Sequence, residues 1–388
     1  MRKWLAAGAA LLLIPWAMSL MWMGRAGAAE EAKTDTAGSG IGWETGDGGF
    51  DAEAELSAGS GSILEADGSR NGAGSDLKAD LRTDLRTDLE AEPGADLGAD
   101  GTEEAASSGA GQTGYRILME RDGTATYLDL EDYLPGVIVC QISPDQPIEA
   151  LKCQAVIART YIRRLMDGRT EIHEEELDLD YLGGGAGSLP GRASMTQTER
   201  EALAAGLSRC RQAAEETAGV VMTAEGRWIL PLFHAMSAGR TRTGDSAYPY
   251  LQSVESRWDG EREGFRQEFA WSREEFARLV SQMGDQVPVS ASQIAGQIQT
   301  IRKDDAGYLE EIKIGPATFS GETLQYALGL PSSCIQVEET EDEIRIVTRG
   351  AGHGYGLSQA GAASMAEEGW DYPSILQYYY KNISLTSE

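Results

Sequence analysis

The stretch VCQISPDQPIEALKC, residues 139–153, places two carboxylates and two amides where an apolar run meets a helical pattern. Asp145 and Glu149 are its acidic residues, and Gln141 directly follows the apolar run. Carboxylates placed at such a turn can exchange protons with a substrate, whereas a neutral amide has no proton to give at an accessible pKa. The sequence therefore predicts acid–base chemistry here only if a carboxylate, and not Gln141, supplies the proton.

A second candidate is the glycine-rich stretch GAGHGYGLSQ, residues 350–359. It does not fit a dinucleotide-binding fingerprint, because the third glycine would fall on Leu357 or Gln359. The glycines allow a ligand or another backbone to approach His353 closely at the start of a helix. We therefore predict a site role for His353.

The stretch FHAMSAGRTRT, residues 233–243, holds His234 and Ser237 three positions apart. No nucleophile-elbow pattern surrounds Ser237, so a serine-hydrolase triad is weakly supported. A zinc site would need His173, His234 and His353 to converge with a further ligand, which their spacing neither shows nor excludes.

Aromatic and acidic residues are combined in YPYLQSVESRWD, residues 248–259. Tyr250, Glu255 and Trp258 give this stretch the composition of a sugar-binding groove, in which rings stack on sugars and carboxylates bind hydroxyl groups. The alternative is an ordinary aromatic loop that packs on the core.

The elements that must position these residues follow from hydrophobic periodicity and caps. Apolar residues at helical spacing predict a helix over 147–168, with Pro147 in its first turn and Asp145 or Gln146 as its cap. The apolar run 137–139 is expected to be extended, after a short helix or turn over 129–136. Further helices are predicted over 196–217, 272–283 and 357–368, and strands over 115–120, 124–128, 219–223, 228–235, 300–302, 309–314 and 343–349. Because no regular βαβ period is present, the predicted fold class is α+β.

Three parts of the 388-residue chain differ sharply in composition. Residues 1–29 hold an apolar run long enough to span a bilayer, which predicts a membrane anchor with the rest exported, or else a cleaved signal sequence. Residues 30–112 carry 20 acidic and 5 basic side chains and little apolar surface, so they predict a disordered acidic spacer. Residues 113–388 are expected to form the folded domain.

The formal net charge of −29 argues against a nucleic-acid partner, because phosphate binding depends on clustered Lys and Arg. The four cysteines match no paired zinc motif. In an exported domain they permit disulfides, and four buried thiols are the alternative.

Three blocks of the sequence resemble the stage II sporulation protein D family. The first consists of LEDYL at 130–134 and IEALKCQAVIARTY at 148–161. The second is YLQSVESRWD at 250–259. The third consists of GHGYGLSQAGA at 352–362 and YPSILQYYYK at 372–381. They stand in the family's order and span residues 113 to about 383, so the anchor and spacer lie outside the resemblance.

The resemblance implies a membrane-tethered, extracytoplasmic protein that acts on peptidoglycan during endospore formation. Family enzymes are lytic transglycosylases that cut MurNAc–GlcNAc bonds of peptide-stripped strands, alongside a partner amidase and possible membrane scaffold proteins; other members are amidase enhancers. The matching blocks imply a substrate groove lined by Arg159, Tyr161, His234, Tyr250, Glu255, Trp258, His353, Tyr355, Ser358 and Gln359.

The sequence departs from the family at two positions. The family's catalytic glutamate stands eight residues before the glutamate of the IEALK block, and that position is Gln141 here. Some members also carry a cysteine three residues after a histidine as a zinc ligand, and Ser237 stands there instead, so we expect no metal or other cofactor.

Two hypotheses remain for the activity. In the first, the protein is a working lytic transglycosylase in which Asp145, Glu149, Glu131 or Glu255 replaces the missing acid. In the second, it is a non-hydrolytic glycan-binding or complex-forming member. For Glu149 and Asp145 a purely structural role is also open, because carboxylates stabilise the start of a helix.

Overall fold

The structure is a computed structural model that describes residues 113–121, 123–182, 195–283 and 289–388. The predicted anchor and acidic spacer lie outside these residues. Among the described residues, no helix is long and apolar enough to cross a membrane. Helices and strands are mixed without a repeating order, which confirms the α+β class.

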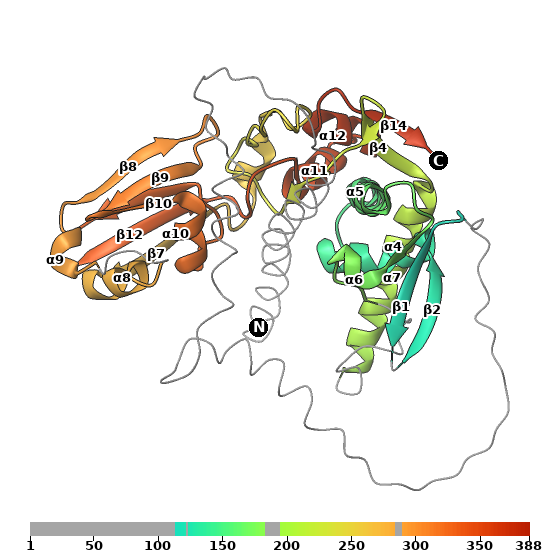
Figure 1. The fold of residues 1–388 in the computed structure, drawn as a ribbon, viewed down its shortest axis with the longest axis horizontal. Helices are drawn as coiled ribbons and strands as arrows, with labels where there is room; N and C mark the ends of the chain where they lie inside the picture. Colours follow the sequence, from blue (N-terminus) through green and yellow to red (C-terminus); the bar gives the residue numbers. More distant parts are fainter. Residues whose placement is uncertain (1–112, 122, 183–194, 284–288) are drawn as a thin grey trace, which may run out of the picture. The chain divides into compact units, whose positions relative to one another are not determined.

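The helical half of the fold is built around α5 (Ile148–Met166). Figure 1 shows α5 beside α4 (Leu130–Gln141), with α7 (Gln197–Glu216) and β4 (Val220–Ala224) close to them. The carboxyl-terminal helices α11 (Gln359–Glu367) and α12 (Tyr372–Tyr379) also contact α5. The predicted helices over 147–168, 196–217 and 357–368 are therefore confirmed. α5 is buried over most of its length, so it carries residues of two hydrophobic clusters.

Small sheets surround these helices. β1 (Arg116–Arg121) pairs with β2 (Thr124–Asp129) and, in parallel, with β3 (Glu171–His173), which the short helix α6 (Glu174–Leu177) follows. β4 pairs with β5 (Arg227–Trp228) and with the terminal β14 (Ser384–Ser387). β6 (Phe233–His234) pairs in parallel with β13 (Leu357–Ser358), so the predicted strand over 228–235 is divided between two sheets.

The α4 segment corrects two expectations. The apolar run 137–139 is helical, not extended, because α4 continues through Pro135 to Gln141. Its buried residues Leu130, Tyr133, Leu134, Val137 and Ile138 recur at helical spacing, and burying that face outweighs the loss of one backbone hydrogen bond at Pro135. Neither Asp145 nor Gln146 caps α5, whose N-cap is Pro147. The Arg209 guanidinium holds this loop by donating to the carbonyl oxygens of Pro144 and Gln146, at 2.7 Å each.

A separate lobe is inserted between the second and third sequence blocks. One of its sheets has the order β11 (Ile335–Glu339), β12 (Glu343–Arg349), β7 (Arg266–Ser272), and the other has the order β10 (Ala317–Ser320), β9 (Leu309–Ile314), β8 (Ile298–Lys303). Three helices complete the lobe, α8 (Arg273–Val280), α9 (Ala291–Ile294) and α10 (Gly321–Ala327), as Figure 1 shows. The predicted helix over 272–283 and the strands over 300–302, 309–314 and 343–349 are confirmed. The lobe encloses its own apolar cluster.

Candidate functional site

Three buried glutamines meet at the end of α4, and we call them the amide cluster: Gln141, Gln154 and Gln359. They come from α4, α5 and α11 and are 3%, 1% and 6% exposed. Gln154 donates from Nε2 to Gln141 Oε1 at 2.7 Å. Gln359 donates from Nε2 to Gln154 Oε1 at 3.1 Å and to the Gln141 carbonyl oxygen at 2.9 Å. The position at which the resemblance implies an acid is therefore held by a neutral hydrogen-bonded network.

This network also fixes the orientation of the Gln141 amide. Because its Oε1 accepts from Gln154, its Nε2 is directed away from that bond, and Nε2 makes no hydrogen bond with any described residue. An amide nitrogen can donate a hydrogen bond to a ligand oxygen but cannot transfer its proton. Gln141, which is 3% exposed, therefore offers at most a hydrogen-bond donor, and acid catalysis would need another group.

The carboxylates proposed as replacements lie elsewhere or are engaged. Glu149 accepts from the Lys152 ammonium at 2.7 Å through Oε1 and from the Tyr372 backbone N–H at 2.8 Å through Oε2. Asp145 and Glu255 are exposed. Among the described residues, none of the proposed carboxylates hydrogen-bonds to the amide cluster.

The fourth candidate, Glu131, forms a buried ion pair with Arg159. The guanidinium donates to both carboxylate oxygens, at 2.7 and 2.6 Å, and to the carbonyl oxygens of Ala214 and Val220 at 3.1 Å. Arg159 is 1% exposed, so its donors face protein groups. This pair connects α4 and α5 to the end of α7, which is a structural task, and the predicted substrate role of Arg159 stays a prediction.

A second buried cluster surrounds Asp259, and we call it the carboxylate cluster: Asp259, Ser237, Ser256 and Ser358. Asp259 is fully buried in the 3₁₀ helix η3 (Arg257–Glu261). It accepts from Ser237 Oγ at 2.5 Å and the Ser237 backbone N–H at 2.9 Å, and from Ser358 Oγ at 2.9 Å. Desolvation by burial raises the pKa of Asp259, while the serine hydrogen bonds oppose that shift.

The carboxylate cluster fixes the start of α11. Ser358 is the N-cap of that helix and accepts from the Gly361 backbone N–H at 3.2 Å, while its own hydroxyl donates to Asp259. Gln359 of the amide cluster is the next residue. Asp259 and Gln154 were not among the predicted site residues, although both lie inside the sequence blocks that carry the resemblance.

The two predicted histidines do come together, because β6 and β13 are neighbours. The His234 and His353 rings are 5.6 Å apart between centroids and nearly fully buried. His234 Nδ1 lies 3.0 Å from the Tyr355 carbonyl oxygen, and His353 Nδ1 accepts from the Tyr355 backbone N–H at 3.0 Å. Burial lowers the pKa of His234 to about 4 and that of His353 well below its usual value. Both imidazoles are therefore neutral at physiological pH.

Glycines in the third block are needed for this approach. Gly352 has φ 100°, and a Cβ there would lie 2.8 Å from His234 Cβ. Gly354 has φ 86°, and a Cβ there would collide with the Tyr308 ring. The groups that lie close to these glycines are therefore protein groups, one of which is the Tyr308 ring of the inserted lobe.

The residues present do not fit the family's zinc site. Ser237 donates its hydroxyl to Asp259, and a serine hydroxyl is a poor zinc ligand. Exposed His173 lies on β3, in a different sheet from His234. Within the described residues, no three His, Cys, Asp or Glu side chains are grouped as metal ligands. All four cysteines are free thiols, so the disulfides that an exported domain would permit are not formed.

The remaining predicted binding residues divide between core and surface. Tyr161 and Tyr250 are buried, and the Tyr250 hydroxyl accepts from the Leu230 backbone N–H at 2.8 Å. Tyr355 is half-buried and stacks near the Arg242 guanidinium, 4.4 Å from its ring centroid. Trp258 is half-buried on a surface with Trp370 and Tyr378, two residues that were not predicted individually.

Comparison with known proteins defines the class to which these features belong. Residues 120–223 match the model of the Stage II sporulation protein family. This segment contains Gln141 and Gln154, and it therefore holds a domain of that family, as the sequence blocks predicted.

Individual relatives extend the match beyond that domain. The Stage II sporulation protein D of Bacillus subtilis (strain 168) is 28% identical over 263 residues, which are 67% of this chain and 75% of that protein. The protein of the same name from Bacillus amyloliquefaciens is 28% identical over 273 residues, 67% of this chain and 74% of its own length. The Amidase enhancer of Bacillus subtilis (strain 168) is 43% identical over 56 residues, only 14% of this chain and 8% of that protein.

Proposed function

We propose that this protein binds the glycan strands of peptidoglycan during sporulation-linked remodelling of the cell wall and does not itself supply the acid for strand cleavage. The observation that carries the proposal is the amide cluster, in which Gln141 occupies the family's acid position and is held by Gln154 and Gln359. The proposal also takes the protein to be exported and held at the membrane by residues 1–29.

The chemistry of bond cleavage supports binding over catalysis. A glycosidic bond breaks when a carboxylic acid protonates the leaving oxygen. Gln141 cannot do this, and Glu149 already binds both Lys152 and the start of α12. Glu131 is committed to Arg159, and losing one partner of such a buried pair costs about 3 to 5 kcal/mol. A replacement acid would therefore have to leave a partner or act from an exposed position.

A role in a complex is consistent with this proposal. Strand binding without cleavage can hold a second enzyme at its substrate, because tethering raises the local concentration of that enzyme. The partner we propose is a cell-wall amidase, a class suggested by the short match to the Amidase enhancer.

The test uses the purified full-length chain, peptide-stripped glycan strands and mass spectrometry of the products. We expect the wild-type protein to sediment with the strands and to release no anhydro-muramyl ends. In Gln141→Glu, the new carboxylate can accept from Gln154 as the amide oxygen does, which leaves its second oxygen for the substrate. We expect this variant to bind strands and to gain cleavage if the rest of the groove is competent.

Gln154→Glu is the matched control, because it places a carboxylate in the same cluster but away from the family's acid position. It should bind or fold less well and should not cleave. Anhydro-muramyl products from the wild-type protein would contradict the proposal in favour of a transglycosylase with a relocated acid. Failure of the wild-type protein to sediment with strands would contradict it altogether.

A further inference from the structure

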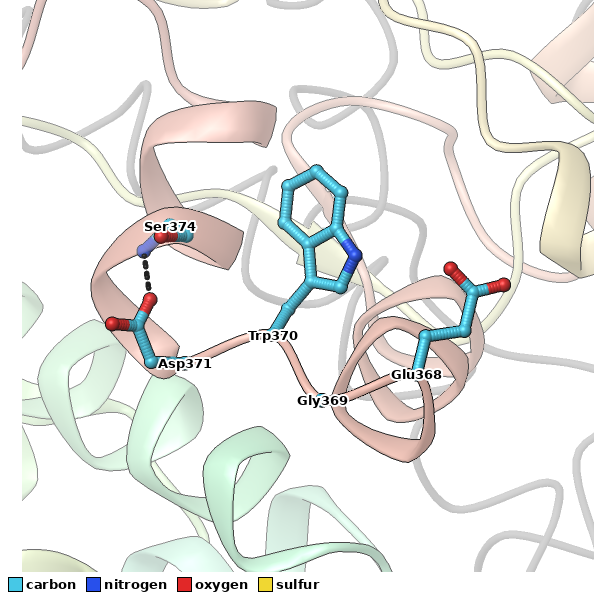
Figure 2. Close-up of a pocket in the computed structure, with 5 residues that line it drawn as sticks. All are labelled: Glu368, Gly369, Trp370, Asp371 and Ser374. Atoms are coloured by element: carbon cyan, nitrogen blue, oxygen red, sulfur yellow. Dashed lines mark hydrogen bonds between the residues drawn. The ribbon is translucent and has the colours of Figure 1, made fainter.

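A surface pocket lies at the far end of α11 from the amide cluster. It has a volume of about 440 Å³ and is lined by Glu368, Gly369, Trp370, Asp371 and Ser374. Figure 2 shows the Trp370 ring standing between Glu368 on one side and the start of α12, with Asp371 and Ser374, on the other. Gln359 and Glu368 are separated by nine residues of helix, a rise of about 13 Å. The amide cluster and this pocket therefore lie at opposite ends of one short helix.

The orientation of the Trp370 ring is restricted by contacts with two other aromatic rings. Its ring lies 6.3 Å from Trp258 at 79° and 5.9 Å from Tyr378 at 80°, and Trp258 lies 5.8 Å from Tyr378 at 76°. Such edge-to-face contacts leave part of each ring face uncovered and restrict its rotation. A rigid half-buried ring that borders a pocket is a preformed stacking surface.

Most polar groups around the Trp370 ring are held by hydrogen bonds, and one N–H donor has no partner among the described residues. Trp258 donates from Nε1 to Glu368 Oε1 at 2.7 Å, whereas the Trp370 Nε1–H has no hydrogen-bond partner among the described residues. Asp371 accepts from the Ser374 backbone N–H at 3.0 Å, and the Ser374 hydrogen bonds keep the pKa of Asp371 below its usual value. The pocket thus offers one free donor and charged acceptors on either side of an aromatic ring.

The charge balance selects among ligands. The two titratable residues that line the pocket are acidic, so phosphate-rich and other anionic ligands are disfavoured. Arg257 lies 4.0 Å from Glu368, and its guanidinium lies 5.1 Å from the centre of the Trp258 ring, which offsets part of the negative charge. A neutral ligand with hydroxyl and amide groups suits an aromatic face flanked by such acceptors and one donor.

The loop that lines the pocket also contacts the first turn of α5, the helix that carries Gln154 of the amide cluster. The Tyr372 backbone N–H donates to Glu149 in the first turn of α5, and Lys152 lies 5.9 Å from the centre of the Tyr372 ring. The loop that carries Trp370 and Asp371 is therefore fixed relative to the helix that carries Gln154.

We propose that Trp370 is a stacking platform for a neutral N-acetylhexosamine of the glycan strand, with Glu368 and Asp371 binding its hydroxyl groups. This inference rests on the proposed function, because it adds a second contact to the strand bound at the amide cluster. It assigns neutral sugars of the N-acetylglucosamine type, not the carboxylate-bearing sugars of the same strand, to this pocket.

The test titrates the full-length chain with N-acetylglucosamine tetramer and follows tryptophan fluorescence and calorimetric heat. We expect Trp370→Ala to weaken tetramer binding about tenfold or more, as truncation of a central aromatic anchor does. Trp370→Phe keeps a stacking ring and loses the Nε1–H, so its loss should be smaller. Glu368→Gln can still accept from Trp258 and tests the charge alone, without removing that contact. Trp271→Ala, in β7 of the inserted lobe, is the control for removing a tryptophan elsewhere.

Strand sedimentation of the same variants separates failure of this inference from failure of the proposed function. Equal tetramer affinity in wild type and Trp370→Ala, with both still sedimenting with strands, would overturn the platform and leave the proposed function intact. A fluorescence change with Nα-acetyl-lysine, but none with the tetramer, would also overturn it, because the pocket would then be a site for a cation. If the wild-type protein did not sediment with strands, both the proposed function and the role of Trp370 would be contradicted.

Discussion

Two buried polar clusters meet at the start of α11, because Ser358 and Gln359 are consecutive residues that belong to different clusters. The carboxylate cluster buries a titratable group, Asp259, and surrounds it with serine hydroxyl groups and a backbone N–H. The amide cluster includes Gln141, where the resemblance implies an acid, and contains only neutral side chains. Asp259 thus accepts hydrogen bonds that fix the start of α11, whereas the amide cluster lacks a proton donor.

This difference shows that a buried carboxylate with a shifted pKa need not be a catalytic acid. Asp259 has a raised pKa, a property that often marks a catalytic acid, yet it is fully buried and hydrogen-bonded to Ser237 and Ser358. Gln141 does not titrate, and its amide nitrogen makes no hydrogen bond within the part of the chain that the structure describes. The raised pKa of Asp259 therefore reflects its burial and does not by itself mark a catalytic acid.

Removing the Asp259 carboxylate should have the largest effect on stability. Asp259→Ala leaves the Ser237 and Ser358 donors without their acceptor in a buried site, and hydrogen bonds to charged groups contribute about 1.5 to 3 kcal/mol each. We expect the free energy of unfolding to fall by about 3 kcal/mol, measured by urea denaturation. The control is Glu261→Ala, an exposed residue of the same η3 helix, which should change it by less than about 0.5 kcal/mol. A loss below about 1 kcal/mol in Asp259→Ala would mean that the serines find other partners.

The amide cluster should respond to the same kind of change with a smaller loss. Gln154→Leu keeps the approximate side-chain volume but removes the donor to Gln141 and the acceptor for Gln359. Because these partners are neutral, we expect the free energy of unfolding to fall by about 2 kcal/mol. Gln212→Leu, on the exposed face of α7, is the matched control and should be nearly neutral. Equal losses in Gln154→Leu and Asp259→Ala would remove the distinction between the two clusters.

Much of this architecture could be predicted from the sequence, because the signals were local. Periodicity located α5 and α7 to within about two residues, although the predicted cap of α5 was wrong, and alternation located β9 and β12. The spacing of the motif identified Gln141 as the family's acid position. The full length of α4 was not predicted, because a proline such as Pro135 usually ends a helix. The tertiary packing that tolerates Pro135 within α4 cannot be read from the local sequence.

The composition of the two clusters could not be predicted in the same way. Gln141 and Gln154 are 13 residues apart, but Gln359 lies 218 residues from Gln141, and Ser237 and Asp259 lie 22 residues apart in a loop-rich segment. Such contacts arise from tertiary packing of α4, α5 and α11, which leaves no periodic pattern in the chain. The resemblance indicated which blocks matter without showing that Gln154 and Asp259 are the residues that organise them.

The smallest expected difference between the two clusters is in how their contributions to the free energy of unfolding depend on pH. Burial raises the pKa of Asp259 above its ordinary value of 3.8, so between these two pKa values the folded state binds more protons than the unfolded state. The contribution of Asp259 is therefore fully present below about pH 3.8 and is lost as pH rises through the folded pKa, by about 1.4 kcal/mol for each unit of the shift. In urea denaturation across this range, the difference between wild type and Asp259→Asn should fall as pH rises. The difference between wild type and Gln154→Leu should stay constant, because no titrating group is removed. A constant difference for Asp259→Asn would show that the serine hydrogen bonds fully offset the burial of its charge.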